Sequence, residues 1–103
     1  MKVILKSKRN THFATAEYKE GVLTILPGSK INTTLSYEAM AESIKALRSN
    51  TDMVSSDGIV LKKITFSSPS AAAQFVTGRS VNGYISWRID DKISLKEYRN
   101  QKK

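Results

Sequence analysis

The basic side chains that could bind phosphate are concentrated in segments that contain no acid. Residues 1–10 and 58–89 hold no Asp or Glu, and their basic residues are Lys2, Lys6, Lys8, Arg9, Lys62, Lys63, Arg79 and Arg88. The chain as a whole has a formal net charge of +8. If the two segments lie near each other, they form a positive face that attracts nucleic-acid phosphates. The alternative is that the excess charge serves only solubility.

Polar side chains next to these cations could add hydrogen bonds to a phosphate or a base edge. Ser80 and Asn82 lie in a predicted loop, although Asn82-Gly83 is also a common turn sequence. Arg79 could bind a carboxylate of its own chain or a phosphate of a partner, and the sequence leaves both open. The candidate nucleic-acid-binding residues are therefore Lys62, Lys63, Arg79, Ser80, Asn82 and Arg88.

Residue types that most catalytic or metal sites require are missing. The sequence has no cysteine, which excludes disulfides, thiolate metal sites and a cysteine nucleophile. His12 is the single histidine, so the serines have no clear general-base partner and a multi-histidine metal site is excluded. Glycine-rich phosphate-binding motifs are absent, and Asp90-Asp91 fits a solvated turn. We therefore expect no enzyme, with no catalytic residue, metal or cofactor.

The N-terminal part of the chain predicts three strands joined by short turns. Residues 1–6 alternate apolar and basic side chains, residues 12–18 form a second strand, and residues 22–26 form a third that ends at Pro27-Gly28. Because a parallel return requires a long crossover, short turns predict an antiparallel meander.

The rest of the chain alternates helices and strands. Ser36 is the predicted N-cap of a helix that ends at residues 49–52, and residues 59–66 predict a strand with a bulge near Lys62-Lys63. Ser68, followed by Pro69, predicts the start of a helix that stops at Gly78. The last elements expected are a strand over residues 84–89, with Ile85, Trp87 and Ile89 inward, and a helical turn over 94–99.

These elements predict a single α+β domain over residues 1–103. We expect a mainly antiparallel sheet of about five strands and two helices in the order β-β-β-α-β-α-β, with a short C-terminal turn or helix and frayed residues 100–103. No apolar stretch approaches the roughly 20 residues that a membrane span requires. The basic start has no signal-peptide pattern, so a cytoplasmic location is expected.

The stretch SSPSAAAQFVTGRSVNGYISW, residues 67–87, resembles the signature of a bacterial and archaeal family of unknown function. Members carry a Ser-Pro-Ser-Ala-Ala-Ala helix, a Gly-Arg-Ser, an Asn-Gly-Trp and a second tryptophan. LPGSK at residues 26–30 is similar to a Gly-Ser after the early hairpin of that family. The resemblance covers residues 13–95, and Tyr84 stands where the family usually has its first tryptophan.

The resemblance implies a context as well as a fold. The family domain is often appended to GIY-YIG-type nucleases or found with restriction–modification proteins. A similar helix occurs in the restriction-enzyme adenine-methylase-associated domain, which is proposed to read DNA. This chain has no Gly-Ile-Tyr … Tyr-Ile-Gly arrangement, so the resemblance implies the accessory module without cleavage.

Two functions from different classes follow. The first is a non-catalytic module that contacts nucleic acid, with DNA favoured over RNA. The alternative is a protein-interaction module that docks on a separate nuclease or methyltransferase through its small-residue helix or an exposed edge strand. Homodimerisation through the same helix is a third possibility.

Overall fold

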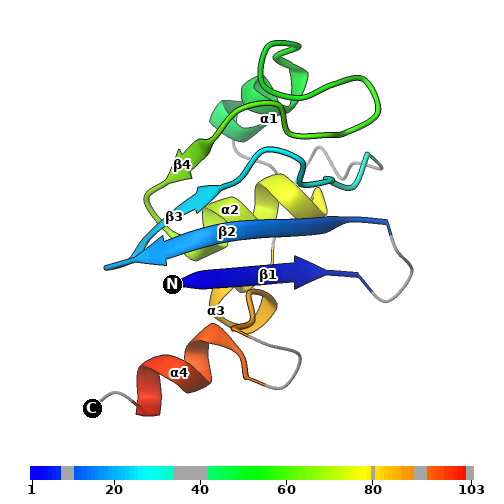
Figure 1. Ribbon diagram of the computed structural model, residues 1–103. Helices are drawn as coiled ribbons and strands as arrows, with labels where there is room; N and C mark the ends of the chain where they lie inside the picture. The colour runs from blue at the N-terminus through cyan, green and yellow to red at the C-terminus, as the bar shows by residue number, and fades with distance from the viewer. Residues whose placement is uncertain (8–10, 34–41, 80, 90–92, 102–103) are drawn as a thin grey trace.

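The computed structural model describes residues 1–7, 11–33, 42–79, 81–89 and 93–101. Its sheet has four strands in the order β1-β2-β3-β4, all antiparallel (Figure 1). The strands are β1 (Lys2–Lys6), β2 (Phe13–Lys19), β3 (Val22–Ile25) and β4 (Ile64–Phe66). The helices are α1 (Glu42–Ser49), α2 (Pro69–Thr77), α3 (Gly83–Ser86) and α4 (Leu95–Gln101). This confirms the α+β fold, with one strand fewer than expected.

Strands β1 to β3 form the predicted meander. Val3 pairs with Ala16, and Ala16 pairs with Ile25, so these three side chains share one face of the sheet. The turn between β2 and β3 places Glu20 and Gly21 at φ values of 51° and 85°. Alternation along the strands buries one set of side chains, namely Val3, Leu5, Ala14, Ala16, Leu23 and Ile25.

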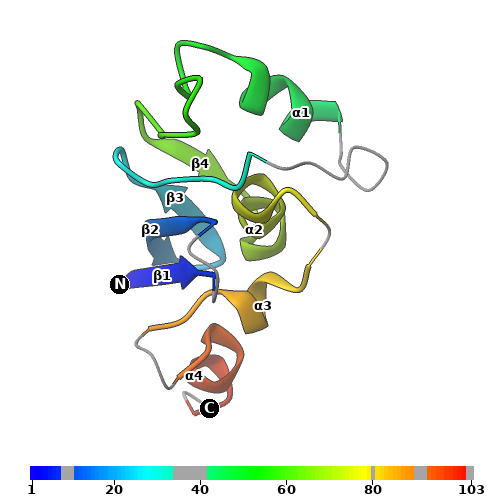
Figure 2. The ribbon, with the colours of Figure 1, turned by 90° about the vertical axis from the view of Figure 1, so that its right-hand side faces the viewer.

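Helix α2 covers this apolar face, as Figure 2 shows. The Ser68 hydroxyl accepts a hydrogen bond from the Ala71 amide at 3.2 Å, and Gly78 ends the helix in the left-handed region at φ 79°. Both caps agree with the sequence prediction. Ala72 and Ala73 are completely buried, and small side chains there let the helix axis lie close to the sheet. The ring of Phe75 packs against that of Phe66 with centroids 5.4 Å apart.

The strand predicted over residues 84–89 is wrong. Asn82 instead caps the short helix α3, its Oδ1 accepting from the Tyr84 amide at 3.0 Å. Gly83 lies so close to α2 that an added Cβ would stand 2.2 Å from the Pro69 carbonyl carbon. Ile85 is 49% exposed rather than inward, whereas Trp87 is fully buried and donates its indole N–H to the Pro69 carbonyl at 3.0 Å.

The remaining elements follow the predictions in part. Helix α1 ends near residue 49 as expected, whereas its predicted cap Ser36 lies outside the described residues. The predicted strand over 59–66 is regular only from Ile64, and residues 59 and 60 form isolated bridges. The expected C-terminal turn is α4, and Lys102 and Lys103 lie outside the described residues. No helix within the described ranges is long and apolar enough to cross a membrane.

Candidate nucleic-acid interface

The predicted basic residues do not form one cluster. Lys62 and Lys63 are exposed and directly precede β4, one edge of the sheet. Arg88 is bridged to Ile4 of β1, at the opposite edge, by two backbone hydrogen bonds of 2.8 Å. Because neighbouring strands lie about 4.8 Å apart, the steps from Arg88 across to β4 span roughly 19 Å. A single phosphate cannot contact both ends of this set.

Arg79 lies on the side of the sheet that α2 covers. It follows the C-cap Gly78 directly, and the Thr77 hydroxyl accepts from its amide at 3.3 Å and donates to its carbonyl at 3.0 Å. The Arg79 side chain is exposed, and its guanidinium is close enough to His12 to contribute to a lowered pKa of that imidazole. Burial of His12 is the larger cause of this lowering.

The two polar candidates in the loop differ in what the structure shows. Asn82 is exposed, but its side-chain oxygen is used as the N-cap of α3. Ser80 lies outside the described residues. The side-chain oxygen of Asn82, which was predicted to bind a partner, is therefore used to cap α3.

The structure brings a different set of residues together on the side of the sheet opposite α2. Figure 2 shows no described helix on that side, which we call the open face. Its strand residues alternate with the buried ones along each strand. They are Lys2, Ile4, Lys6, Phe13, Thr15, Glu17, Lys19, Val22, Thr24 and Thr65, and the bridged residues Lys30 and Arg88 extend them.

Cross-strand pairing fixes which side chains of the open face are neighbours. Directly paired residues of antiparallel strands project on the same side, with Cβ atoms about 5 Å apart. One row joins Arg88, Ile4 and Thr15. A second row joins Lys6, Phe13 and Lys30, and continues from Lys30 to Ile59. Residues from distant parts of the sequence thereby meet on one surface.

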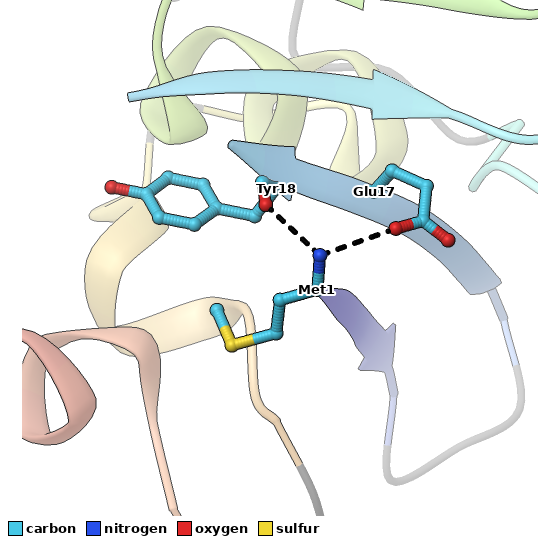
Figure 3. Close-up of polar contacts among 3 residues, drawn as sticks. All are labelled: Met1, Glu17 and Tyr18. Atoms are coloured by element: carbon cyan, nitrogen blue, oxygen red, sulfur yellow. Dashed lines mark hydrogen bonds and ion pairs between the residues drawn. The ribbon is translucent and has the colours of Figure 1, made fainter. Parts of the chain in front are cut away.

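The open face is strongly basic. Its cationic side chains are all exposed, and they are Lys2, Lys6, Lys19, Lys30 and Arg88. Among the residues described on this face, Glu17 is the only acid. It pairs across the strands with Lys2, and the amino group of Met1 donates to its Oε2 at 3.3 Å (Figure 3). This ammonium group partly offsets the carboxylate charge of Glu17, and it also donates to the Tyr18 carbonyl at 3.3 Å.

Phe13 places an aromatic ring among these cations. Its side chain is 48% exposed, although phenylalanine is usually buried. The backbone of Phe13 is held on both sides, because it pairs with Lys6 of β1 and exchanges hydrogen bonds of 2.9 and 2.7 Å with Lys30. A half-exposed aromatic ring is thus carried at a fixed backbone position of a basic surface.

Other cations serve the fold. The Arg48 guanidinium donates to the carbonyls of Phe75 and Asn32, which ties α1 to the end of α2 and to the segment after β3. Lys45 pairs with Glu42 on α1 at 3.4 Å. Within the described ranges, no group of three or more His, Cys, Asp and Glu side chains could hold a metal ion.

The predicted site included Arg88 but not Phe13 or Lys30, and it left out Lys2 and Lys6 although both belong to the acid-free segment expected to form a positive face. The alternation of residues 1–6 places Lys2 and Lys6 on the polar side of a strand, and this signal was available. Phe13 was ambiguous because a phenylalanine beside Ala14 and Ala16 would ordinarily be assigned to the core. Lys30 reaches the face only through its bridge to Phe13, across the turn at Pro27-Gly28, which no local pattern specifies.

Residues 4–99 match the family model described as a domain of unknown function, DUF4357, and the chain belongs to this family. The expected membership of a domain-of-unknown-function family is thereby confirmed. Comparison with curated proteins and with solved structures gives no significant match.

Proposed function

We propose that this domain is a non-catalytic module that binds nucleic acid through the open face of its sheet. The observation that supports this most is the grouping of exposed cations from β1, β2, Lys30 and Arg88 on one surface that no described helix covers. Cations that replace the counterions of a phosphate backbone gain affinity from counterion release. The positions of the acids also favour this surface. Apart from Glu17, the described acids lie in turns, loops and helices rather than on the strands of the open face.

We further propose that the nucleic acid is DNA and that the module works beside a nuclease or a restriction–modification protein. The resemblance of residues 67–87 to the signature of such accessory domains supports this context. The structure gives these residues a folding role, since they form α2, α3 and the buried Trp87. The signature therefore supports the family context, and the binding residues are sought on the sheet.

Docking on a protein through the small-residue helix is the weaker alternative. Ala72 and Ala73 are completely buried, so the alanines expected to contact a partner are used inside the domain. The free edge offered by β4 is short, since that strand spans only residues 64–66. We therefore favour nucleic acid as the partner of this domain.

The proposal is tested by fluorescence anisotropy with labelled duplex and single-stranded DNA at about 50 and 200 mM salt. The variant Lys30→Gln/Arg88→Gln removes two cations from the open face. Each lost phosphate contact lowers the slope of log affinity against log salt by about 0.9 on duplex or about 0.7 on a single strand. We expect weaker binding and a slope reduced by up to about twice these values.

The matched control is Lys45→Gln/Arg79→Gln, which removes the same charge from α1 and from the loop after α2. We expect it to bind almost as tightly as the parent protein. Failure of the parent to bind any DNA at low salt would exclude the proposed function. A control variant that loses more affinity than the open-face variant would move the interface to the predicted loop.

A further inference from the structure

We infer that the open face binds a single-stranded segment, with the ring of Phe13 as the platform on which an unpaired base stacks. This inference rests on the proposed function and names the class of its ligand. It is carried by a feature of the open face that phosphate binding leaves unexplained, a half-exposed phenyl ring between two lysines.

The ring is positioned for stacking by the backbone that holds it. Phe13 pairs with Lys6 on one side and with Lys30 on the other, so a cation stands on each neighbouring strand. The two hydrogen bonds to Lys30 fix the backbone of Phe13 in the ladder. A backbone that is already ordered loses little conformational entropy when a base stacks on the ring that it carries.

Base pairing decides which nucleic acid can use the ring. In a duplex the faces of the bases are covered by their neighbours, so the protein meets phosphates and groove edges. In a single strand the bases can be splayed out and stacked on an aromatic side chain while the phosphates follow a basic surface. The combination of Phe13 with Lys6 and Lys30 matches the second arrangement.

Hydroxyl groups lie on the same face, in the first and second rows beyond that of Phe13. Thr15 shares the neighbouring row with Ile4 and Arg88. The Thr24 and Thr65 hydroxyls are hydrogen-bonded to each other at 3.0 Å across β3 and β4. The Thr15 hydroxyl, and the hydroxyl proton of the Thr24–Thr65 pair that their mutual bond leaves, can donate to phosphate or base oxygens without selecting one base. The surface therefore fits single strands of varied sequence.

The test compares labelled oligo-dT and oligo-U, each of about 12 nucleotides, with a duplex of the same length. We expect both single strands to bind more tightly than the duplex. The relative affinities of oligo-dT and oligo-U distinguish a DNA from an RNA ligand. Phe13→Leu keeps the apolar bulk but removes the aromatic face. It should weaken single-strand binding by roughly 5- to 150-fold and change duplex binding little.

Two further variants separate stacking from folding. Phe13→Trp keeps an aromatic face, so it should bind single strands at least as tightly as the parent. Stacking should quench the emission of the new, exposed indole. The native Trp87 is buried and should not respond. Ile85→Ala removes a side chain that is equally exposed on α3, and single-strand affinity should stay unchanged.

The outcomes distinguish this inference from the function on which it rests. If no nucleic acid binds, the proposed function fails. If the duplex binds as tightly as the single strands, or if Phe13→Leu retains full single-strand affinity while its thermal unfolding is unchanged, the stacking role is wrong although the domain binds nucleic acid.

Discussion

His12 lies close enough to the loop after α2 for the Arg79 guanidinium to act on its imidazole. Its imidazole Nδ1 lies 3.1 Å from the Thr11 hydroxyl, and the residue directly precedes β2. Burial first, and then the Arg79 guanidinium, lower the pKa of His12 below its ordinary value of 6.5. Both effects disfavour the charged imidazolium in the folded chain.

This lowered pKa predicts a loss of stability on acidification. The unfolded chain binds a proton at His12 at higher pH than the folded chain does, so the stabilisation is present above pH 6.5 and is lost as the pH falls below it. Between about pH 8 and 5.5, urea unfolding of the parent protein should show a decrease in the free energy of unfolding. In His12→Gln this decrease should be smaller. In an NMR titration, Arg79→Gln should raise the pKa of His12 part of the way back. A pKa of His12 at or above 6.5 in the parent would contradict this account.

At the scale of elements, α1 is joined to the domain by few contacts. Ile44 is its buried residue and Leu47 packs partly against the core. The guanidinium of Arg48 adds hydrogen bonds to the carbonyls of Phe75 and Asn32. A planar donor fork can reach two carbonyls at once, which the single ammonium of a lysine does less well.

Arg48→Lys should therefore destabilise the docking of α1. Hydrogen bonds that involve a charged group contribute about 1.5–3 kcal/mol each, and a buried carbonyl left without its donor adds a penalty of its own. We expect faster amide hydrogen exchange in α1 and a decrease of about 1–3 kcal/mol in the free energy of unfolding. Lys45→Gln on the same helix is the control, and it should leave the exchange rates of α1 and the free energy of unfolding nearly unchanged. Equal exchange rates in Arg48→Lys and the parent would show that these bonds do not hold α1.

Elements that depend on local signals were predictable, and those that depend on distant contacts were not. Ser68, Pro69 and Gly78 define α2 by capping chemistry that acts within one turn of helix. Asn82-Gly83 is typical of a hairpin turn, yet the same asparagine can cap a helix. The outcome is set by Trp87, whose indole N–H reaches the Pro69 carbonyl, and by the close approach of Gly83 to α2.

For the part of the molecule that the structure describes, helix α2 covers one side of the sheet and no helix covers the other. Antiparallel sheets of this kind commonly bury apolar residues on one face and expose polar ones on the other. Here the exposed face is basic and carries Phe13, which ordinary solvation does not require. The alternation of residues 1–6 predicted a strand with one polar side. The pairing of Lys30 with Phe13 and of Arg88 with Ile4 depends on the tertiary fold, so the assembled surface could not be predicted from the sequence.

In the proposed function the open face, rather than the loop after α2, contacts nucleic acid. Chemical-shift mapping by NMR during titration with a single-stranded oligonucleotide tests it most directly. We predict the largest amide shifts at Ile4, Lys6, Phe13, Thr15, Lys30 and Arg88, and little change at Ile44, Leu47 and Ala73. Shifts concentrated at Arg79 and Asn82, with the open-face amides unmoved, would show that the loop after α2 is the interface and the open face is not.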